Sequence, residues 1–262
     1  MNNNDLVSII VLSYNNLQYM KDCLSSILVQ TYPYIEIIIS DDFSDDFSMD
    51  EIKIYIESNR KNNLINYVIN QNCCNLGTVK NINNAIRLAT GNYFVHIACD
   101  DIFFDNQAIS NIVDFYSKTN YLIAAGQIAR YDESLNSFLF TLPLQQYVKY
   151  IYGNPIDCYK KLCDGDFIPS PGMSYKRELL NRYGMYDEEY MLIEDYPRWL
   201  YLTRNGCSIG YIEKLLVKYR SGGMSTSDKD SNIKRIFLND LELVKKKEIV
   251  PYIDQIKYII YK

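Results

Sequence analysis

The sequence predicts an α/β protein whose central sheet is mainly parallel and flanked by helices. Short β-branched runs alternate with helical patterns through the first half of the 262-residue chain, and such alternation builds right-handed βαβ units. The first of these runs, 7–12, is continuous and apolar, which is typical of a strand buried on both faces. No internal repeat or low-complexity linker interrupts the chain. We therefore expect one α/β domain with a helical extension.

The elements of the first half follow from the spacing of their apolar residues. Repeats of three and four residues predict helices, and Pro33 and Gly91 provide stop signals for two of them. The predicted strands are 7–12, 35–39, 64–69 and 93–98, and the predicted helices are 17–28, 49–56 and 79–89.

Beyond residue 120 the pattern is looser. We expect a long strand at 121–131, an ambiguous segment at 138–150, a helix at 155–163, extended chain at 167–175, a helix at 196–204 and two short strands within 208–219. Helical spacing returns from Asp228 onward. The predicted organisation is a domain at 1–226 followed by a helical appendix at 227–262.

Composition and charge exclude several classes of protein. The net charge is -5 and no basic block occurs, so we expect no nucleic-acid partner. The seven cysteines form no CxxC pair and His96 is the only histidine, which argues against zinc and for reduced, buried thiols in a cytoplasmic protein. The N-terminus lacks the basic region of a signal peptide, and no apolar run approaches the roughly 20 residues that span a bilayer. A peripheral contact with the inner face of the membrane is left open.

Three polar clusters follow predicted strands at the point where each strand ends. Because ligands collect at the carboxyl ends of parallel strands, these clusters indicate a site, although each one alone is also compatible with an ordinary turn. The clusters are Ser13-Tyr14-Asn15, Asp41-Asp42 and Asp100-Asp101.

The site has oxygen ligands and no nearby sulfur or imidazole pair, which favours Mg²⁺ or Mn²⁺ over zinc. Phosphate oxygens usually complete the shell of a hard cation held by few carboxylates, so a nucleotide or diphosphate ligand is expected. Neither a P-loop nor a GxGxxG pattern is present, which argues against an ATPase and against a dinucleotide enzyme.

Several segments together resemble family 2 glycosyltransferases, which are inverting enzymes with the GT-A fold. The resemblance begins with 7–15, 25–32 and 36–42. It continues through Asn75-Leu76-Gly77, Asn81, Asn83, Gly91-Asn92-Tyr93, Asp100-Asp101, 184–188, 194–197 and 219–223, and therefore covers residues 6 to about 226.

The resemblance implies a donor site for a nucleotide sugar, most often a UDP-sugar, with Mn²⁺ or Mg²⁺. Ser13, Tyr14 and Asn15 would line the nucleoside pocket, and Asp42 or Asp41 would bind the base. Asn75, Gly77 and Lys80 would continue the donor site, although Lys80 is first of all an ordinary lysine on a helix face. The metal would be bound by Asp100 and Asp101.

The same resemblance places the general base at Asp195, with Glu194 beside it. Physical chemistry agrees with this role, because a carboxylate opposite the leaving group can accept the proton of the attacking hydroxyl. Segment 168–173 is expected to form the wall beside the donor sugar. The implied acceptor is a saccharide or a lipid-linked saccharide of a bacterial surface polymer, and a homodimer is left open.

Two departures from the family pattern keep other hypotheses open. Ala98 replaces the usual first acid of the metal motif, and Ser221 replaces a common histidine, with Arg220 as a substitute phosphate contact. A degenerate member that binds nucleotide without turnover is therefore an alternative. A sugar nucleotidyltransferase is a further one, but it needs a basic, glycine-rich loop after the first strand, where Ser13-Tyr14-Asn15 stands.

Overall fold

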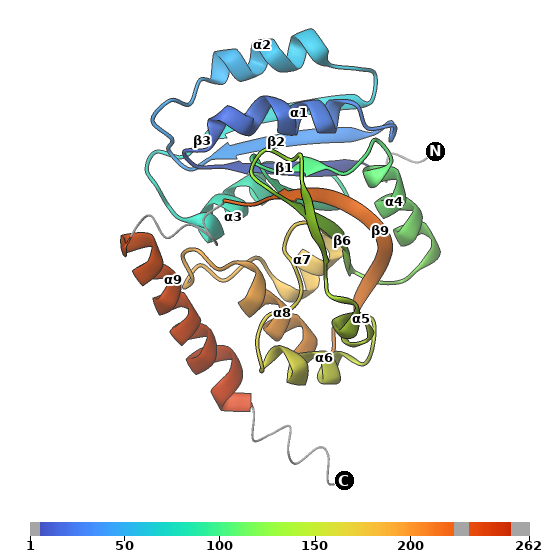
Figure 1. Ribbon diagram of the computed structural model, residues 1–262, viewed down its shortest axis with the longest axis vertical. Helices are drawn as coiled ribbons and strands as arrows, with labels where there is room; N and C mark the ends of the chain where they lie inside the picture. The colour runs from blue at the N-terminus through green and yellow to red at the C-terminus, as the bar shows by residue number, and fades with distance from the viewer. Residues whose placement is uncertain (1–5, 223–230, 253–262) are drawn as a thin grey trace.

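One sheet with helices on both faces organises the part of the chain that the structure, a computed structural model, describes: residues 6–222 and 231–252 (Figure 1). Its strands run in the order β3-β2-β1-β4-β8-β6-β9-β5, and β7 pairs with β6. The strands are β1 (Val7–Ser13), β2 (Ile35–Asp41), β3 (Leu64–Gln71), β4 (Tyr93–Ala98), β5 (Ile102–Phe103), β6 (Ile123–Tyr131), β7 (Phe138–Leu142), β8 (Met173–Lys176) and β9 (Ile209–Arg220).

Helices connect these strands and cover the sheet. In chain order they are η2 (Leu17–Tyr19), α1 (Met20–Leu28), α2 (Met49–Asn59), α3 (Thr78–Leu88), α4 (Ala108–Lys118), α5 (Gln145–Ile151), α6 (Pro155–Leu162), α7 (Arg177–Tyr183), α8 (Asp195–Arg204), α9 (Ser231–Val244) and the π-helix η3 (Lys245–Ile249).

The amino-terminal half of the sheet is parallel, as the alternating pattern predicts. Strands β3, β2, β1 and β4 lie side by side in the same direction, and Ser13 pairs in register with Asp41. On the other side of β1, Leu12 pairs with Ala98. The carboxyl ends of β1, β2 and β4 therefore lie at one level, which brings the three polar clusters of the sequence to the same edge.

The second half of the sheet is mixed. Strand β8 runs antiparallel to β4 and β6, whereas β6 and β9 are parallel. The two short strands expected within 208–219 are one twelve-residue strand, β9, whose pairing with β6 shifts register beside Gly126 and Gln127. The extended segment expected at 167–175 forms a strand only at its end, in β8, and helices α4 and α7 had no counterpart in the prediction.

Two apolar cores lie on opposite faces of the sheet. Helices α1, α2 and α4 cover one face, and α3, α6 and α8 cover the other (Figure 1). Side chains of β1 alternate between them, since Val7, Ile9 and Val11 enter the first core and Ile10 enters the second. Burial on both faces explains why this strand is a continuous apolar run.

Trp199 and His96 both lie in the interior of the protein. Trp199 is 1% exposed, and its indole N–H donates to the Ile168 carbonyl at 3.2 Å. His96 is buried in β4 beside the Tyr175 hydroxyl, and burial lowers the pKa of its imidazole to about 3. It is therefore a neutral packing residue. All seven cysteines are free, but Cys73 and Cys74 are exposed, contrary to the expectation of buried thiols.

The expected C-terminal helix is present as α9, which continues into η3 and runs beside α8 (Figure 1). The boundary expected at residue 226 lies outside the described residues and stays a prediction. Within the described ranges, none of the helices combines the length and the apolar character needed to cross a bilayer.

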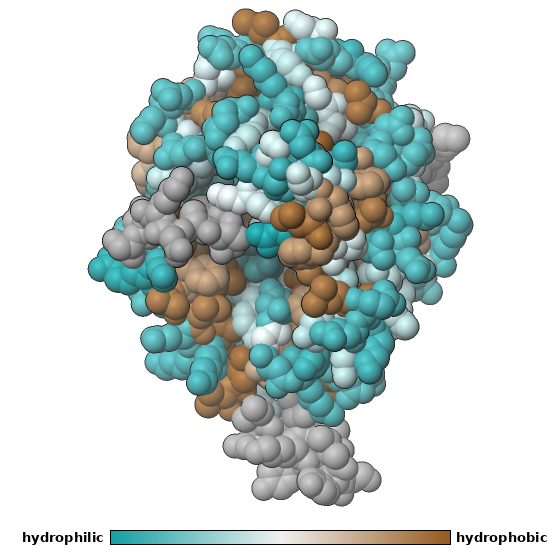
Figure 2. Space-filling view, viewed as in Figure 1, coloured by the Kyte–Doolittle hydropathy of each residue, from teal (hydrophilic) through white to brown (hydrophobic). Residues whose placement is uncertain are grey.

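One face of the molecule carries exposed apolar side chains. Figure 2 shows them near the middle of the view, where the β6–β7 hairpin lies in Figure 1. The exposed large residues of β7 are Phe138, Leu139 and Phe140. Among the described strands, β7 pairs only with β6. It is therefore an edge strand of the sheet.

The close contact between β6 and β9 yields a test of the fold. A Cβ atom on Gly126 would lie 2.1 Å from Leu216 Cδ1, so Gly126→Ala should lower the free energy of unfolding by about 1–3 kcal/mol. Leu216→Ala should cost about 2–5 kcal/mol. The double variant should cost less than the sum, because removal of Leu216 makes room for the new methyl group. Urea unfolding of the three variants measures this, and strict additivity would contradict the packing.

Candidate active site

Asp41 ties together the loops that follow β1 and β2. Its carboxylate accepts hydrogen bonds from the Ser13 hydroxyl at 2.8 Å and from the Ser44 N–H at 2.7 Å. The Ser44 hydroxyl in turn accepts the N–H of Asn15 at 2.8 Å. Asp41 is fully buried. Its first role is therefore to hold the two loops against each other, which leaves Asn15 exposed and Tyr14 half-buried at the surface of the site.

Asp42 holds the loop that connects β3 to α3. One carboxylate oxygen accepts the Asn72 side-chain amide and the Leu76 N–H, both at 2.9 Å, and the other accepts the Gly77 N–H at 2.8 Å. The Asn75 side chain also accepts the Gly77 N–H, at 3.1 Å. The Asn75-Leu76-Gly77 motif is thus wrapped around a buried carboxylate, and a nucleobase would have to share acceptor positions that the loop already uses.

Gly77 brings this loop to the segment that precedes α8. Its φ angle is +84°, in the left-handed region that glycine adopts freely. A Cβ atom here would lie 2.5 Å from the Met191 carbonyl oxygen, and that oxygen accepts the Val79 N–H at 3.2 Å. Lys80, the next residue of α3, is exposed. The predicted donor loop and the chain leading to Glu194 are therefore in direct contact.

The turn after β4 is held by Arg220 at the end of β9. The Arg220 backbone N–H donates to Asp101 Oδ1 at 2.8 Å, and its guanidinium donates to the Asp100 carbonyl at 2.7 Å. The guanidinium also donates to the Glu133 carbonyl and lies 4.1 Å from the centre of the Tyr19 ring. Arg220 is 5% exposed. The Arg220 guanidinium was expected as a substitute phosphate contact. Its internal contacts argue against that role.

The two aspartates of this turn differ in access. Asp100 is half-buried, whereas Asp101 has no exposed surface and its Oδ2 has no hydrogen-bond partner among the described residues. Burial raises the pKa of the Asp100 carboxyl, and burial together with the charge of Asp100 raises that of Asp101 well above its usual range. A cation would relieve both effects.

The donor set fits a divalent cation only in part. Two adjacent carboxyl groups, one with a buried unpartnered oxygen, are oxygen ligands of the kind Mg²⁺ and Mn²⁺ prefer. Ala98 stands where the family pattern has a further acid, and its methyl group cannot bind a cation. In the described part of the chain no group of three or more His, Cys, Asp and Glu side chains is arranged to hold a metal. The phosphates of a bound ligand would have to supply the remaining oxygens.

A second group of acids lies at the start of α8. Asp195 is the first residue of this helix, and its carboxylate accepts the Tyr196 N–H at 2.7 Å. Glu194 accepts the Ser170 hydroxyl at 3.0 Å. Asp166, which the sequence analysis did not single out, is the third acid: the charges of Asp195 and Glu194 contribute to its raised pKa.

Burial raises the pKa values of these three acids. Burial, and next the charge of Asp195, raises the pKa of Glu194 to about 8, from an ordinary 4.5. Burial also raises the pKa of Asp195, while the hydrogen bond from Tyr196 opposes the increase. At pH 7 Glu194 is therefore neutral and Asp195 is the stronger candidate for the ionised carboxylate. Buried neighbouring acids with raised pKa values are typical of functional sites.

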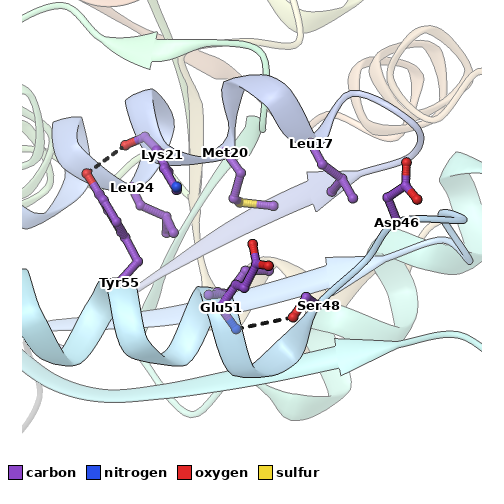
Figure 3. A pocket seen from close by; sticks show the side chains of 9 residues that line it. Leu17, Met20, Lys21, Leu24, Asp46, Ser48, Glu51 and Tyr55 are labelled. Carbon is purple, nitrogen blue, oxygen red and sulfur yellow. Dashed lines mark hydrogen bonds between the residues drawn. The ribbon is translucent and has the colours of Figure 1, made fainter.

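A separate small cavity lies between α1 and α2 (Figure 3). Its volume is about 70 Å³, and Leu17, Met20 and Tyr55 are among its lining residues. Ligand pockets generally measure about 300–1,000 Å³, so this cavity is too small to hold a nucleotide sugar.

The structure links some of the predicted residues in a chain of contacts that does not include Asp100 and Asp101. Ser13, Asp41 and Asp42 join the β1 and β2 loops, Gly77 joins them to Met191, and Met191 leads to Glu194 and Asp195. Asp166 carried no signal in the sequence, because a single acid between Gly165 and Phe167 matches no motif. Asn83 was noted only as part of the resemblance; it binds the Tyr186 backbone from both ends of its amide.

Comparison with known proteins identifies the family. The model of glycosyl transferase family 2 matches residues 8–184, more than half of the chain. The chain belongs to this family. A glycosyltransferase of Haemophilus influenzae described as uncharacterized is 30% identical over 235 residues, which are 87% of this chain and 69% of the relative. Glycosyltransferase GlyG of Streptococcus pneumoniae is 29% identical over 143 residues, 55% of this chain and 46% of GlyG.

Solved structures confirm the GT-A fold predicted for this glycosyltransferase. S. aureus TarS 1-349, in complex with UDP-GlcNAc, gives a TM-score of 0.66 at 18% identity and covers 96% of this chain and 70% of that one. The mannosyltransferase PcManGT from Pyrobaculum calidifontis, in complex with GDP-Man and Mn²⁺, gives 0.61 at 18% identity and covers 80% of this chain and 55% of that one. At this identity the likeness shows the fold alone.

The raised pKa of Glu194 predicts how the stability of the glycosyltransferase depends on pH. A carboxyl group whose pKa is higher in the folded protein stabilises it at low pH, and that contribution is lost as pH rises from about 4.5 to about 8. Glu194→Gln cannot ionise and should therefore be more stable than wild type at pH 9, by more than about 1 kcal/mol, but not at pH 4. Thermal melts at the two pH values test this, with exposed Glu213→Gln as control. A gain equal at both pH values would contradict it.

Proposed function

We propose that this family 2 glycosyltransferase transfers a sugar, with inversion, from a UDP-sugar to a hydroxyl of a saccharide acceptor. The observation that carries the proposal is the contact between two groups of residues far apart in the sequence. The loop around Asp42 touches Met191, three residues before Glu194. A donor held by the first group would therefore lie near the acids of the second.

The nucleoside part of the donor is assigned to the loops after β1 and β2. Tyr14 and Asn15 are the accessible side chains there, while Ser13, Asp41 and Asp42 shape the loops and leave backbone atoms and carboxylate edges for the base. Asn75, Gly77 and exposed Lys80 continue the donor site toward the diphosphate, where the lysine ammonium would offset negative charge.

Asp100, with Asp101 behind it, is assigned to the divalent cation. When bound, Mn²⁺ or Mg²⁺ supplies positive charge that stabilises the departing diphosphate. Asp100 is the accessible ligand, and Asp101 keeps the turn in place through the Arg220 N–H. The mannosyltransferase PcManGT, in complex with GDP-Man and Mn²⁺, supports a metal in this fold.

Asp195 is assigned as the general base. Because Glu194 holds its proton at pH 7, the ionised carboxylate beside it can accept the proton of the acceptor hydroxyl as the new bond forms. Attack from the side opposite the diphosphate inverts the anomeric centre. Ser170 and Tyr196 fix the two acids by hydrogen bonds, so that little reorganisation is needed during the reaction.

The acceptor is proposed to be a saccharide or a lipid-linked saccharide in bacterial surface polymer synthesis. Bacterial glycosyltransferases among the relatives support this choice. TarS in complex with UDP-GlcNAc supports UDP as the nucleotide. A cytoplasmic location, with contact at the inner face of the membrane, belongs to the same proposal.

Substitution of the two acids tests the proposed chemistry. Asp195→Asn removes the ionised base and should lower the rate of sugar transfer at pH 7 by about 10²–10⁴-fold. Glu194→Gln should lower the transfer rate by less than about tenfold, because the neutral amide of Gln imitates the protonated carboxyl group. Transfer is measured as UDP release with a saccharide acceptor, and UDP affinity is measured by titration.

The same experiment separates turnover from binding alone. UDP binding without release from any sugar donor by the wild-type protein would favour a degenerate, non-catalytic family member. Equal losses in Asp195→Asn and Glu194→Gln would contradict the division of roles between the two acids.

Ligand-induced stabilisation tests the donor and metal assignments. Mn²⁺ with a UDP-sugar should raise the melting temperature more than either alone, because each would improve the binding of the other. A ligand at 100 times its Kd adds about 2.7 kcal/mol to the free energy of unfolding. Removal of the metal with EDTA should abolish the synergy, and Asp100→Asn should abolish it without loss of metal-free UDP binding. Exposed Asp50→Asn serves as a control of equal charge change. A larger effect with GDP- or dTDP-sugars would overturn the choice of UDP.

A further inference from the structure

The C-terminal helix holds the segment that precedes the two acids of α8. One oxygen of Asp240, on α9, accepts three backbone N–H groups in succession: Met191 at 3.0 Å, Leu192 at 2.7 Å and Ile193 at 3.0 Å. The other oxygen accepts the Met191 N–H at 3.2 Å. Asp240 is 5% exposed, so a buried carboxylate gathers the backbone directly before Glu194.

This contact fixes the direction of the chain. Residues 191–193 lie outside the helices and strands, so their N–H groups are not paired by the hydrogen bonds of a helix or a sheet. Three consecutive N–H groups reach one oxygen only when they all face the same side, as in the backbone concavities that bind anions. A buried carboxylate in that position strongly disfavours other orientations, because each would leave charge or N–H groups unpaired.

The opposite side of the same segment faces the donor loop. The Met191 carbonyl accepts the Val79 N–H, and Gly77 packs against it with no space for a Cβ atom. Segment 191–193 is therefore held between Asp240 and the loop that Asp42 organises. Its position sets how far Glu194 and Asp195 lie from the predicted donor site.

Further contacts keep α9 and η3 in register with this segment. The Lys247 ammonium pairs with Asp187 and Glu189, which precede the segment. Glu248 forms a buried ion pair with Arg204 at the end of α8. The C-terminal helices are thus attached on both sides of residues 191–193, in a part of the chain beyond the residues matched by the family model.

We propose that Asp240 is a positioning residue for sugar transfer, which places the acids at the start of α8 against the donor loop. The inference rests on the proposed function of Asp195 as general base. Asp240 touches neither of the two acids; it acts through the backbone of residues 191–193.

Three variants of α9 test the role. Asp240→Ala leaves the three N–H groups without an acceptor, and displacement of a catalytic group by about 1 Å costs on the order of 100-fold in rate. We expect kcat to fall by about that factor, with the donor KM within about twofold of wild type. Asp240→Asn keeps one acceptor oxygen without the charge and should fall in between. Glu242→Gln, an exposed acid on the same helix, is the matched control and should retain wild-type kcat.

Hydrogen exchange separates this inference from the proposed function. The amides of Met191, Leu192 and Ile193 should exchange at least about tenfold faster in Asp240→Asn than in wild type or Glu242→Gln, whether or not the protein transfers sugar. Unchanged exchange at these amides overturns the inference. Wild-type kcat in a folded Asp240 variant also overturns it. If Asp240→Ala does not fold, Asp240→Asn decides. Absence of transfer in wild type overturns the proposed function instead.

Discussion

The arrangement of the site depends on one buried carboxylate, that of Asp42. Through the N–H groups of Leu76 and Gly77 it holds the loop before α3 in a shape that only glycine accommodates at position 77. That shape brings the loop against Met191, and hence against the acids of α8. Because hydrogen bonds to a charged acceptor are about twice as strong as neutral ones, a single side chain can fix a loop between a strand and a helix.

Electrostatics gives the two ends of the site different characters. Asp100 and Asp101 are adjacent acids with raised pKa values and one buried oxygen that has no partner among the described residues, and a positive ligand would favour their ionised forms. Asp166, Glu194 and Asp195 form a second negative group in which raised pKa values remove part of the charge. The first group is suited to binding a cation and the second to holding and accepting protons.

Local patterns predicted the parallel half of the sheet because β1, β2 and β4 are buried on both faces and consist mainly of apolar residues. They predicted two short strands where the single strand β9 runs, and they did not predict its register shift beside Gly126, which packs closely against Leu216. Site residues in motifs were found from the sequence. Asp166 and Asp240 were missed, since their importance comes from neighbours 28–29 and 47–49 residues away, respectively.

The hydrogen bond from the Arg220 N–H to Asp101 has a consequence for folding during synthesis. Their 119-residue separation means that the turn after β4 leaves the ribosome long before the strand that completes it. At about 5–20 residues per second, the delay is roughly 6–24 seconds. During that interval β9 is also missing from its place between β6 and β5. The nascent chain therefore exposes an open sheet edge and an unpaired acidic turn together, and both are closed by the same late strand.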